Sequence, residues 1–192
     1  MTKTTSSGRL SVLIISCSLN GSSRSRLLAQ TAESCLNDED VDVDLIDLRE
    51  WDLPFCDGQE SYNHPSVAPL TTLVKDAAAV LLASPIYNYD LNAVAKNLIE
   101  MTGSAWTNKP VGFLCSAGGA GSYMSPMGIS NSLMLDFRSF IIPRFVYALK
   151  QDFTENGDPS APLKDRICEL TTTAVTLARA FAWIEEQDST VG

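Results

Sequence analysis

LSVLIISC, residues 10–17, is followed directly by SLNGSSRS, residues 18–25. The first segment is apolar nearly throughout, which is typical of a parallel strand that is buried on both faces of a sheet. The second segment is polar and leads into residues 24–36, where apolar side chains recur at helical spacing. A buried strand, a short polar loop and an amphipathic helix together predict the first unit of a parallel α/β sheet.

The same alternation continues along the rest of the chain. Further strands are expected at 41–48, 79–84 (where Pro85 stops the strand) and 111–116, with a last strand within 139–149 that Pro143 interrupts. Helices are expected at 67–78, 92–101, 127–137 and from Leu163 to about Glu186, with a long surface loop at 50–69. About five alternations of strand and helix predict a parallel sheet covered by helices on both faces, with right-handed crossovers.

Length and composition indicate one globular domain, at 10–186, between a frayed tail at 1–9 and a C-terminal tail at 187–192. Of the 192 residues, 45 % are hydrophobic and 19 % are charged. The net charge of −9 argues against nucleic acid or an anionic membrane as a partner. No uninterrupted apolar run reaches the ~18 residues of a membrane helix, and the polar start has no signal-peptide pattern. We therefore expect a cytoplasmic protein.

The cysteines and the single histidine predict neither a disulfide nor a metal site. The five cysteines are odd in number and scattered, which favours reduced thiols in a cytoplasmic protein. Cys17 and Cys115 end predicted strands and are expected to lie in the core. His64 has no Cys or His neighbour at ligand spacing, so no metal is assigned.

The loop at 18–25 has the composition of a phosphate site. In open parallel sheets, ligands bind beyond the carboxyl ends of the strands, where the strand order reverses. Four hydroxyls, Arg24 and the amides of a helix N-terminus meet in this loop, and these are the donors that a phosphate monoester needs. The alternative is that Ser22 or Ser23 only caps the helix.

Two further loops follow predicted central strands. SPIYNY, residues 84–89, carries two tyrosines and an amide that could flank a flat heteroaromatic ring, or pack on a helix or a partner subunit. SAGGAGSY, residues 116–123, has glycines that let the backbone approach a ligand, although an ordinary tight turn would also use them. The joint placement of all three loops is more informative than any one of them.

These motifs resemble the NADPH-dependent FMN reductase family of the flavodoxin-like superfamily, over residues 10–179. The resemblance rests on residues 18–25, on 84–89 with LNAVAKNLIE at 91–100, and on the turn at 116–119. It implies a sheet order of 2-1-3-4-5, non-covalent FMN, and NADPH or NADH as co-substrate. Hydride would pass through the flavin to a small acceptor: a flavin, a quinone, an azo compound or a metal oxyanion. Relatives usually form homodimers or homotetramers, with the flavin near the interface.

The resemblance also implies which residues touch the cofactor. The cofactor-binding residues carried over are Ser18, Asn20, Ser23, Arg24, Ser25, Pro85, Ile86, Tyr87, Asn88, Tyr89, Ser116, Gly118 and Gly119. Asn88, Gly118 and Gly119 are candidates for tuning the ring through hydrogen bonds. No side chain is expected as a catalytic nucleophile or acid, because the cofactor carries the chemistry. Many relatives have Arg at the position of Asn20 and Glu at that of Ile86.

Three other functions are weighed against this one. A flavodoxin-type electron carrier would bind FMN without turning over NAD(P)H, and a flavin-free protein could keep the same fold. A hydrolase with a Ser or Cys nucleophile would need a base, but the only histidine lies in a loop and no G-x-S-x-G elbow is present. Trp106 could cover the flavin of a neighbouring subunit, although packing is the favoured role.

Overall fold

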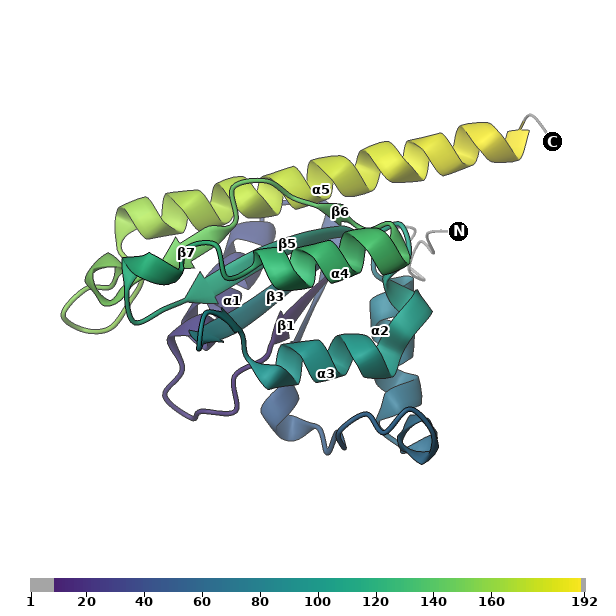
Figure 1. Ribbon diagram of the computed structural model, residues 1–192. Helices are drawn as coiled ribbons and strands as arrows, with labels where there is room; N and C mark the ends of the chain where they lie inside the picture. The colour runs from purple at the N-terminus through teal and green to yellow at the C-terminus, as the bar shows by residue number, and fades with distance from the viewer. Residues whose placement is uncertain (1–8, 191–192) are drawn as a thin grey trace.

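The computed structural model of the chain describes residues 9–190. The strands are β1 (Leu10–Ser16), β2 (Val41–Asp47), β3 (Ala79–Tyr87), β4 (Asp90–Leu91), β5 (Pro110–Ser116), β6 (Phe140–Ile141) and β7 (Val146–Ala148). The helices are α1 (Arg24–Leu36), α2 (Val67–Asp76), α3 (Ala93–Thr102), α4 (Met127–Phe137) and α5 (Ala161–Thr190). Strand and helix alternate as predicted, and Figure 1 shows the helices lying around the central sheet. Residues 1–8 of the expected N-terminal tail lie outside the described part of the chain.

The sheet has the expected order, with β2, β1, β3 and β5 side by side and parallel. Two short strands share the fifth position, because β6 pairs with one end of β5 and β7 with the other. Pro143 and Arg144 lie between them. Proline has no N–H to give to a ladder, and Arg144 has a left-handed φ of 59°. The predicted order 2-1-3-4-5 is therefore confirmed, with the last strand in two pieces.

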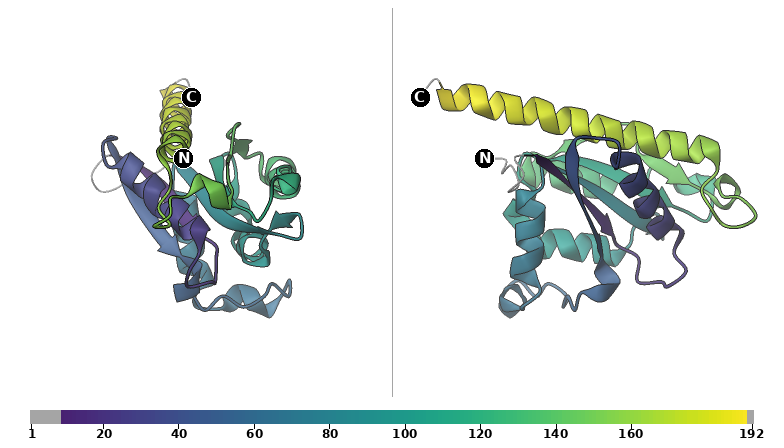
Figure 2. Two further views of the ribbon diagram at one scale, coloured as in Figure 1. Left: turned by 90° about the vertical axis from the view of Figure 1, so that its left-hand side faces the viewer. Right: turned by 180° about the vertical axis from the view of Figure 1, so that it is seen from behind.

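Both faces of the sheet are covered by helices (Figure 2). Successive side chains of a strand point to opposite faces. Val12 and Ile14 therefore pack in the cluster formed with α1 and α5, whereas Leu13 and Ile15 pack in the cluster formed with α2, α3 and α4. Each of these four side chains is at most 1 % exposed. Burial on both faces explains why β1 is apolar throughout. Because β1 lies between β2 and β3, the loop after its carboxyl end starts inside the row of strand ends and not at its margin.

Two elements extend further than the sequence indicated. β3 does not stop at Pro85 but ends at Tyr87, where a two-residue turn leads into the unexpected antiparallel strand β4. Pro85 is tolerated because it lies near the end of the strand, where a missing N–H weakens the ladder least. α5 ends at Thr190, so residues 187–190 of the expected C-terminal tail are helical.

Within the described residues, α5 also meets the length and composition of a membrane span, over Ala161–Gln187. One such helix is weak evidence, because the core helix of a soluble protein passes the same test. The sequence expectation rested on an uninterrupted apolar run, and Glu169 and Arg179 interrupt the run in α5. One side of α5 packs on α1, β3 and β5, and 33 % of the candidate span is buried.

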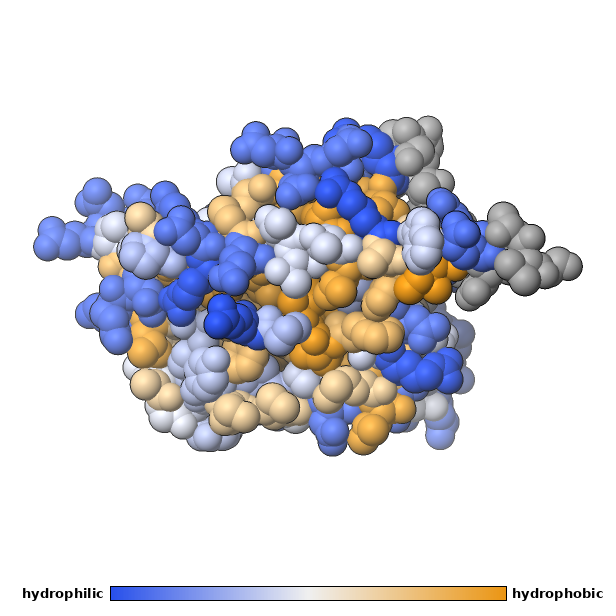
Figure 3. Space-filling model, turned by 90° about the horizontal axis from the view of Figure 1, so that it is seen from above, coloured by the Kyte–Doolittle hydropathy of each residue, from blue (hydrophilic) through white to orange (hydrophobic). Residues whose placement is uncertain are grey.

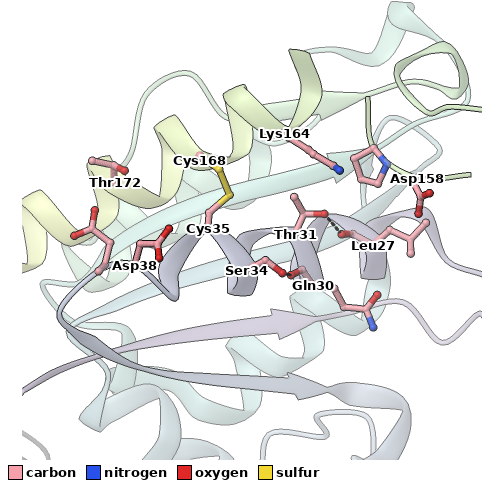
Figure 4. A pocket seen from close by; sticks show the side chains of 12 residues that line it. Leu27, Gln30, Thr31, Ser34, Cys35, Asp38, Asp158, Lys164, Cys168 and Thr172 are labelled. Atoms are coloured by element: carbon pink, nitrogen blue, oxygen red, sulfur yellow. Dashed lines mark hydrogen bonds between the residues drawn. A yellow bond between two sulfur atoms is a disulfide. The ribbon is translucent and has the colours of Figure 1, made fainter. Parts of the chain in front are cut away.

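A disulfide joins α1 to α5. Cys35 and Cys168 are bonded, with their Cα atoms 5.3 Å apart (Figure 4). The prediction that all five thiols are reduced is therefore wrong for this pair. The two cysteines are 133 residues apart in sequence, so only the packing of the two helices brings them together. Cys17 and Cys115 are free and buried in the core, as predicted.

Candidate functional site

The three ligand loops meet in one cavity at the carboxyl ends of β1, β3 and β5. Its volume is about 310 Å³. The residues that line it are Ser18, Asn20, Ser22, Ser23, Arg24, Pro85, Ile86, Tyr87, Ser116, Ala117 and Gly118. The convergence expected from the strand order is therefore present, because the first, second and third loops each contribute at least three residues.

The N-terminus of α1 has no cap of its own. Ser23 occupies the N-cap position with extended backbone, yet its side chain caps no helix amide, and the first turn holds no acidic residue. The Ser23 hydroxyl instead shares a 2.8 Å hydrogen bond with the hydroxyl of Ser25. The first amides of a helix lack intrahelical partners and carry the positive end of the helix dipole. The first amides of α1 therefore face the cavity without a side-chain cap, and a bound anion would accept hydrogen bonds from them. The alternative that Ser23 merely caps the helix is wrong.

Arg26 fixes the shape of the first loop from behind. Its guanidinium donates to the carbonyl oxygens of Gly21 at 3.0 Å and of Ser18 and Asn20 at 3.4 Å each. The same side chain is anchored by Asp47, with Nε 2.7 Å from the carboxylate. With these carbonyls bound by Arg26, their negative ends are turned away from an anion in the cavity. Arg26 is thus a positioning residue that the sequence reading missed.

Asp47 is held in its charged form by two arginines. Burial alone would raise the pKa of its carboxyl group, but hydrogen bonds from Arg26 and Arg49 outweigh burial and hold the pKa below its usual range. Both side chains of the Arg26–Asp47 pair are about one-seventh exposed, at 14 % and 15 %. A carboxylate that stays charged keeps Arg26 oriented toward the loop throughout the neutral pH range.

The second loop is a hairpin whose tip is strained. Asn88 and Tyr89 connect β3 to β4 with φ values of 51° and 69°. Two consecutive left-handed residues form the turn in which Asn-Gly is strongly preferred, so Tyr89 adopts a conformation that is uncommon for a bulky residue. Tyr87 and Tyr89 are nevertheless 54 % and 58 % exposed. Tyr87 lines the cavity, and neither ring fills the core.

Asn92 connects the second loop to the first. Its amide nitrogen donates to the Cys17 carbonyl at 2.7 Å, and its Oδ1 accepts from the Ser84 hydroxyl at 3.0 Å and from the Ala95 amide at 3.3 Å. Asn92 and Ser84 are both buried. One side chain thus fixes the end of β1, the end of β3 and the start of α3 relative to one another.

The third loop has glycines that its own structure does not require. Gly119 has an extended φ of −159°, and Gly118 has no left-handed φ. A Cβ added at either position would have no neighbour within 4 Å. Neither turn geometry nor packing therefore requires these glycines, and Gly118 lines the cavity, where a glycine allows close approach of a ligand. Tyr147 holds the loop, because its hydroxyl donates to the Gly119 carbonyl at 2.7 Å.

Most of the predicted site residues lie together, and a few lie apart. Ser25 is buried behind the first loop, and Asn88, Tyr89 and Gly119 do not line the cavity. Ser22 and Ala117 line it without having been predicted. Both residues belong to loops whose composition already marked them as ligand loops, so the loops could be predicted from the sequence but not these two residues.

The remaining candidates for chemistry have structural roles. Burial raises the pKa of the Cys115 thiol to about 12 and that of Cys17 still further, so neither is a thiolate at neutral pH. His64 accepts from the Ser66 amide and lies 3.7 Å from Asp52, away from the cavity lining. Trp106 is fully buried and donates to Thr102 at 2.7 Å, which is a packing role. The hydrolase hypothesis therefore lacks His64 as a base and Cys17 or Cys115 as a nucleophile.

A larger cavity, of about 670 Å³, lies between α1 and α5 beside the disulfide (Figure 4). Its lining includes the carboxylates of Asp38, Glu39 and Asp158 against a single lysine, Lys164. This excess of negative charge opposes the binding of a phosphate. Cavity volume alone therefore does not identify the phosphate site, whereas the hydrogen-bond donors at the N-terminus of α1 do.

Comparison with known proteins agrees with this geometry. Residues 10–154 match the family model described as NADPH-dependent FMN reductase. A NAD(P)H-dependent FAD/FMN reductase of Geobacillus thermodenitrificans is 30 % identical over 138 residues, which are 68 % of this chain and 72 % of that protein. An NADPH azoreductase of Bacillus sp. is 30 % identical over 124 residues, 62 % of this chain and 70 % of the relative. An oxidoreductase structure from Corynebacterium diphtheriae superposes with a TM-score of 0.74 at 18 % identity, covering 90 % of this chain and 98 % of the other.

Proposed function

Because this chain belongs to the NADPH-dependent FMN reductase family, we propose that its FMN lies in the cavity formed by residues 18–24, 85–87 and 116–118. The protein is an NAD(P)H-dependent FMN oxidoreductase that serves small-molecule acceptors. The observation that carries the placement of FMN is the uncapped N-terminus of α1, which opens into a cavity lined by loops from three central strands. A phosphate group satisfies such a helix terminus.

In this site each loop has a separate task. The Ser23 and Arg24 amides and the Ser18 and Ser23 hydroxyls would bind the phosphate, with Arg24 as the cation, whereas the Ser22 amide already donates to Asn20 Oδ1 at 3.0 Å. FMN held by these loops would supply the redox chemistry, which is hydride transfer between NAD(P)H and the acceptor. Tyr87 and Tyr89 would lie along one side of the ring system, and Asn88 beside them would offer an amide to its edge. The strain at Tyr89 supports this assignment, since strained residues cluster at ligand sites.

The test is an anaerobic titration of the purified protein with FMN, followed by NADPH. We expect the flavin absorbance band to shift on binding and to bleach when NADPH is added. Bound flavin that stays yellow with both NADPH and NADH would favour the flavodoxin-type carrier instead. If the protein fails to bind FMN at all, the proposed site is wrong.

Arg24→Ala is expected to weaken FMN binding by about tenfold, since hydrogen bonds to a charged group contribute about 1.5–3 kcal/mol and Arg24 is exposed to solvent. Fluorescence titration of FMN measures the change. Lys96→Ala is the matched control, because it removes a positive charge that does not line the cavity, from α3, where Lys96 pairs with Glu100 at 2.9 Å. Equal FMN affinities for the two variants would contradict the phosphate role of Arg24.

Arg26→Lys is expected to lower FMN affinity by about tenfold, because a lysine ammonium cannot span one carboxylate and three carbonyls as the planar guanidinium does. The matched control is Arg49→Lys, since the described hydrogen bonds of Arg49 all go to Asp47. Both variants keep a cation beside Asp47, so urea unfolding should change little and similarly in the two. A loss of FMN affinity that is the same in both would overturn the positioning role of Arg26.

We propose that the protein acts as a homodimer or homotetramer. Apolar side chains at the surface support an interface: Phe140 of β6, Trp183 and Ile184 of α5 are 52 %, 62 % and 47 % exposed. The rings of Phe140 and Phe181 pack with centroids 4.5 Å apart, which joins β6 to α5. Figure 3, which looks down on the side of α5, shows hydrophobic residues among the charged ones. Sedimentation of the wild-type protein and of Trp183→Glu would test this assignment.

We propose the cytoplasm as the compartment of action, since NAD(P)H is supplied there as an intracellular reductant. The disulfide between α1 and α5 would then face a thiol-reducing environment. Trapping free thiols with an alkylating reagent in intact cells, followed by mass spectrometry, would report the state of Cys35 and Cys168. A fully alkylated pair agrees with the cytoplasm, and a fully bonded pair agrees with an oxidising compartment.

A further inference from the structure

The cavity of about 670 Å³ between α1 and α5 has the Cys35–Cys168 disulfide in its wall (Figure 4). Both of these cysteines line the cavity and are partly exposed, whereas Cys17 and Cys115 are fully buried. A disulfide is reduced when a thiolate attacks one of its sulfur atoms, so the bond reacts only where a thiolate can reach it. The cavity volume lies within the roughly 300–1,000 Å³ of small-molecule sites. A small thiol can therefore reach this bond in the folded chain.

The cavity around the disulfide carries more negative than positive charge. Its charged lining consists of three carboxylates and one ammonium group, from Asp38, Glu39, Asp158 and Lys164. Glu39 is partly compensated, because the guanidinium of Arg179 lies 3.4 Å from its carboxylate. In the view of Figure 4, Asp38 and Lys164 lie on opposite sides of the disulfide. A thiolate that approaches the bond therefore meets a net negative charge, which repels it more strongly the more negative charge it brings.

We propose that the Cys35–Cys168 disulfide is a thiol–disulfide exchange site that selects its reductant by charge and favours thiols with a cationic group. The attacking species is the thiolate. A thiol with an ammonium group therefore attacks with no net charge, an uncharged thiol attacks with one negative charge, and a thiol with a carboxylate attacks with two. Unit charges ~8 Å apart in water change a rate by about twofold. Across these three classes, the excess of carboxylates in the cavity thus produces a graded preference.

The exchange takes two steps and consumes two thiol groups of the reductant. In the first step, the reagent sulfur bonds to one cysteine, the Cys35–Cys168 bond breaks, and the other cysteine leaves as a thiolate that takes a proton from water. In the second step, another reagent thiolate attacks the reagent sulfur of the mixed disulfide. This attack releases the remaining cysteine, which is protonated in turn, and the disulfide of the reagent. Two electrons thus pass to the protein while two reagent thiols are oxidised.

The experiment measures reduction of the folded, full-length protein by cysteamine, 2-mercaptoethanol and mercaptoacetate. Acid-quenched samples are freed of reagent, unfolded and alkylated, and mass spectrometry follows the modification of Cys35 and Cys168, with the free thiol Cys56 as internal standard. The same thiols acting on the uncharged bis(2-hydroxyethyl) disulfide give their intrinsic reactivities. Relative to that reference, we expect cysteamine to reduce the protein about tenfold faster than mercaptoacetate at low salt. The preference should nearly vanish in 1 M NaCl, where the Debye length is about 3 Å.

Three variants test whether the charges of the cavity cause the preference. Asp38→Asn should lower the ratio of the cysteamine rate to the mercaptoacetate rate by about threefold, and Lys164→Gln should raise it by about the same factor. Asp136→Asn is the matched control, because Asp136 is exposed on α4 and does not line the cavity. It should leave the ratio unchanged.

Each contrary outcome overturns a defined part of the proposal. If no thiol reduces the disulfide in the folded protein, the bond is not an exchange site. Equal relative rates for the three thiols would overturn selection by charge. A preference that persists in 1 M NaCl, or that Asp38→Asn changes no more than Asp136→Asn does, would assign the selection to the shape of the cavity and contradict the proposal. None of these measurements depends on FMN binding, so they leave the test of the proposed function separate.

Discussion

Replacing Ser23 by Asp is expected to make the FMN-free protein more stable while removing most of its FMN binding. The backbone of Ser23 has the extended N-cap conformation, but its hydroxyl caps no amide. An aspartate there can accept the amides of the first turn and interact with the helix dipole, which together stabilise a helix by about 1 kcal/mol. The same carboxylate would occupy the place of the FMN phosphate and repel it.

The expected loss of FMN affinity is about a hundredfold, because two charges a few ångströms apart at a protein surface repel by a few kcal/mol. Ser23→Asn is the matched control, since an asparagine caps the helix almost equally well without a charge. Urea unfolding should show both variants at or above wild-type stability, and FMN titration should separate them. If Ser23→Asp binds FMN as tightly as Ser23→Asn, no phosphate sits at this helix.

The same helix shows how far the sequence alone reaches. The bounds of α1 and α4 agree with the predicted 24–36 and 127–137, because apolar spacing over three turns specifies a helix strongly. The loops of the site were found because local composition marks them. The turn at Asn88 and Tyr89 was missed because it lacks the Asn-Gly signature of such turns, and left-handed backbone at a tyrosine has no sequence signal.

Residues that position the loops escaped prediction for a different reason. In the sequence, Arg26 is only one of several charged residues on a helix. The pairing of β1 and β2 places Asp47, which follows 21 residues later, beside it. Asn92 reads as a helix cap, and it is one, but its bond to the Cys17 carbonyl spans 75 residues. Contacts of this kind depend on which strands are neighbours, and a single sequence read without an alignment gives no such information.

Removing the Cys35–Cys168 disulfide is expected to lower the free energy of unfolding by about 3 kcal/mol, because the bond closes a loop long enough to restrict the unfolded chain strongly. The double variant Cys35→Ser/Cys168→Ser should unfold at a lower urea concentration than the wild type. A reductant should shift the wild type to the same midpoint and leave the double variant where it is. Cys56→Ser is the matched control, since Cys56 is a free and partly exposed thiol.

FMN affinity should stay unchanged in the same double variant, and this second measurement tells what the disulfide does. The bond lies near the C-terminal end of α1, whereas the phosphate site lies at its N-terminus. Leu28, Ala29 and Ala32 are fully buried between the sheet and α5 and hold α1 in place without the bond. Unchanged stability would show that the disulfide does not restrain the chain in solution. A loss of FMN affinity would show that packing alone does not hold the phosphate site, so that the oxidation state of the pair would control the flavin.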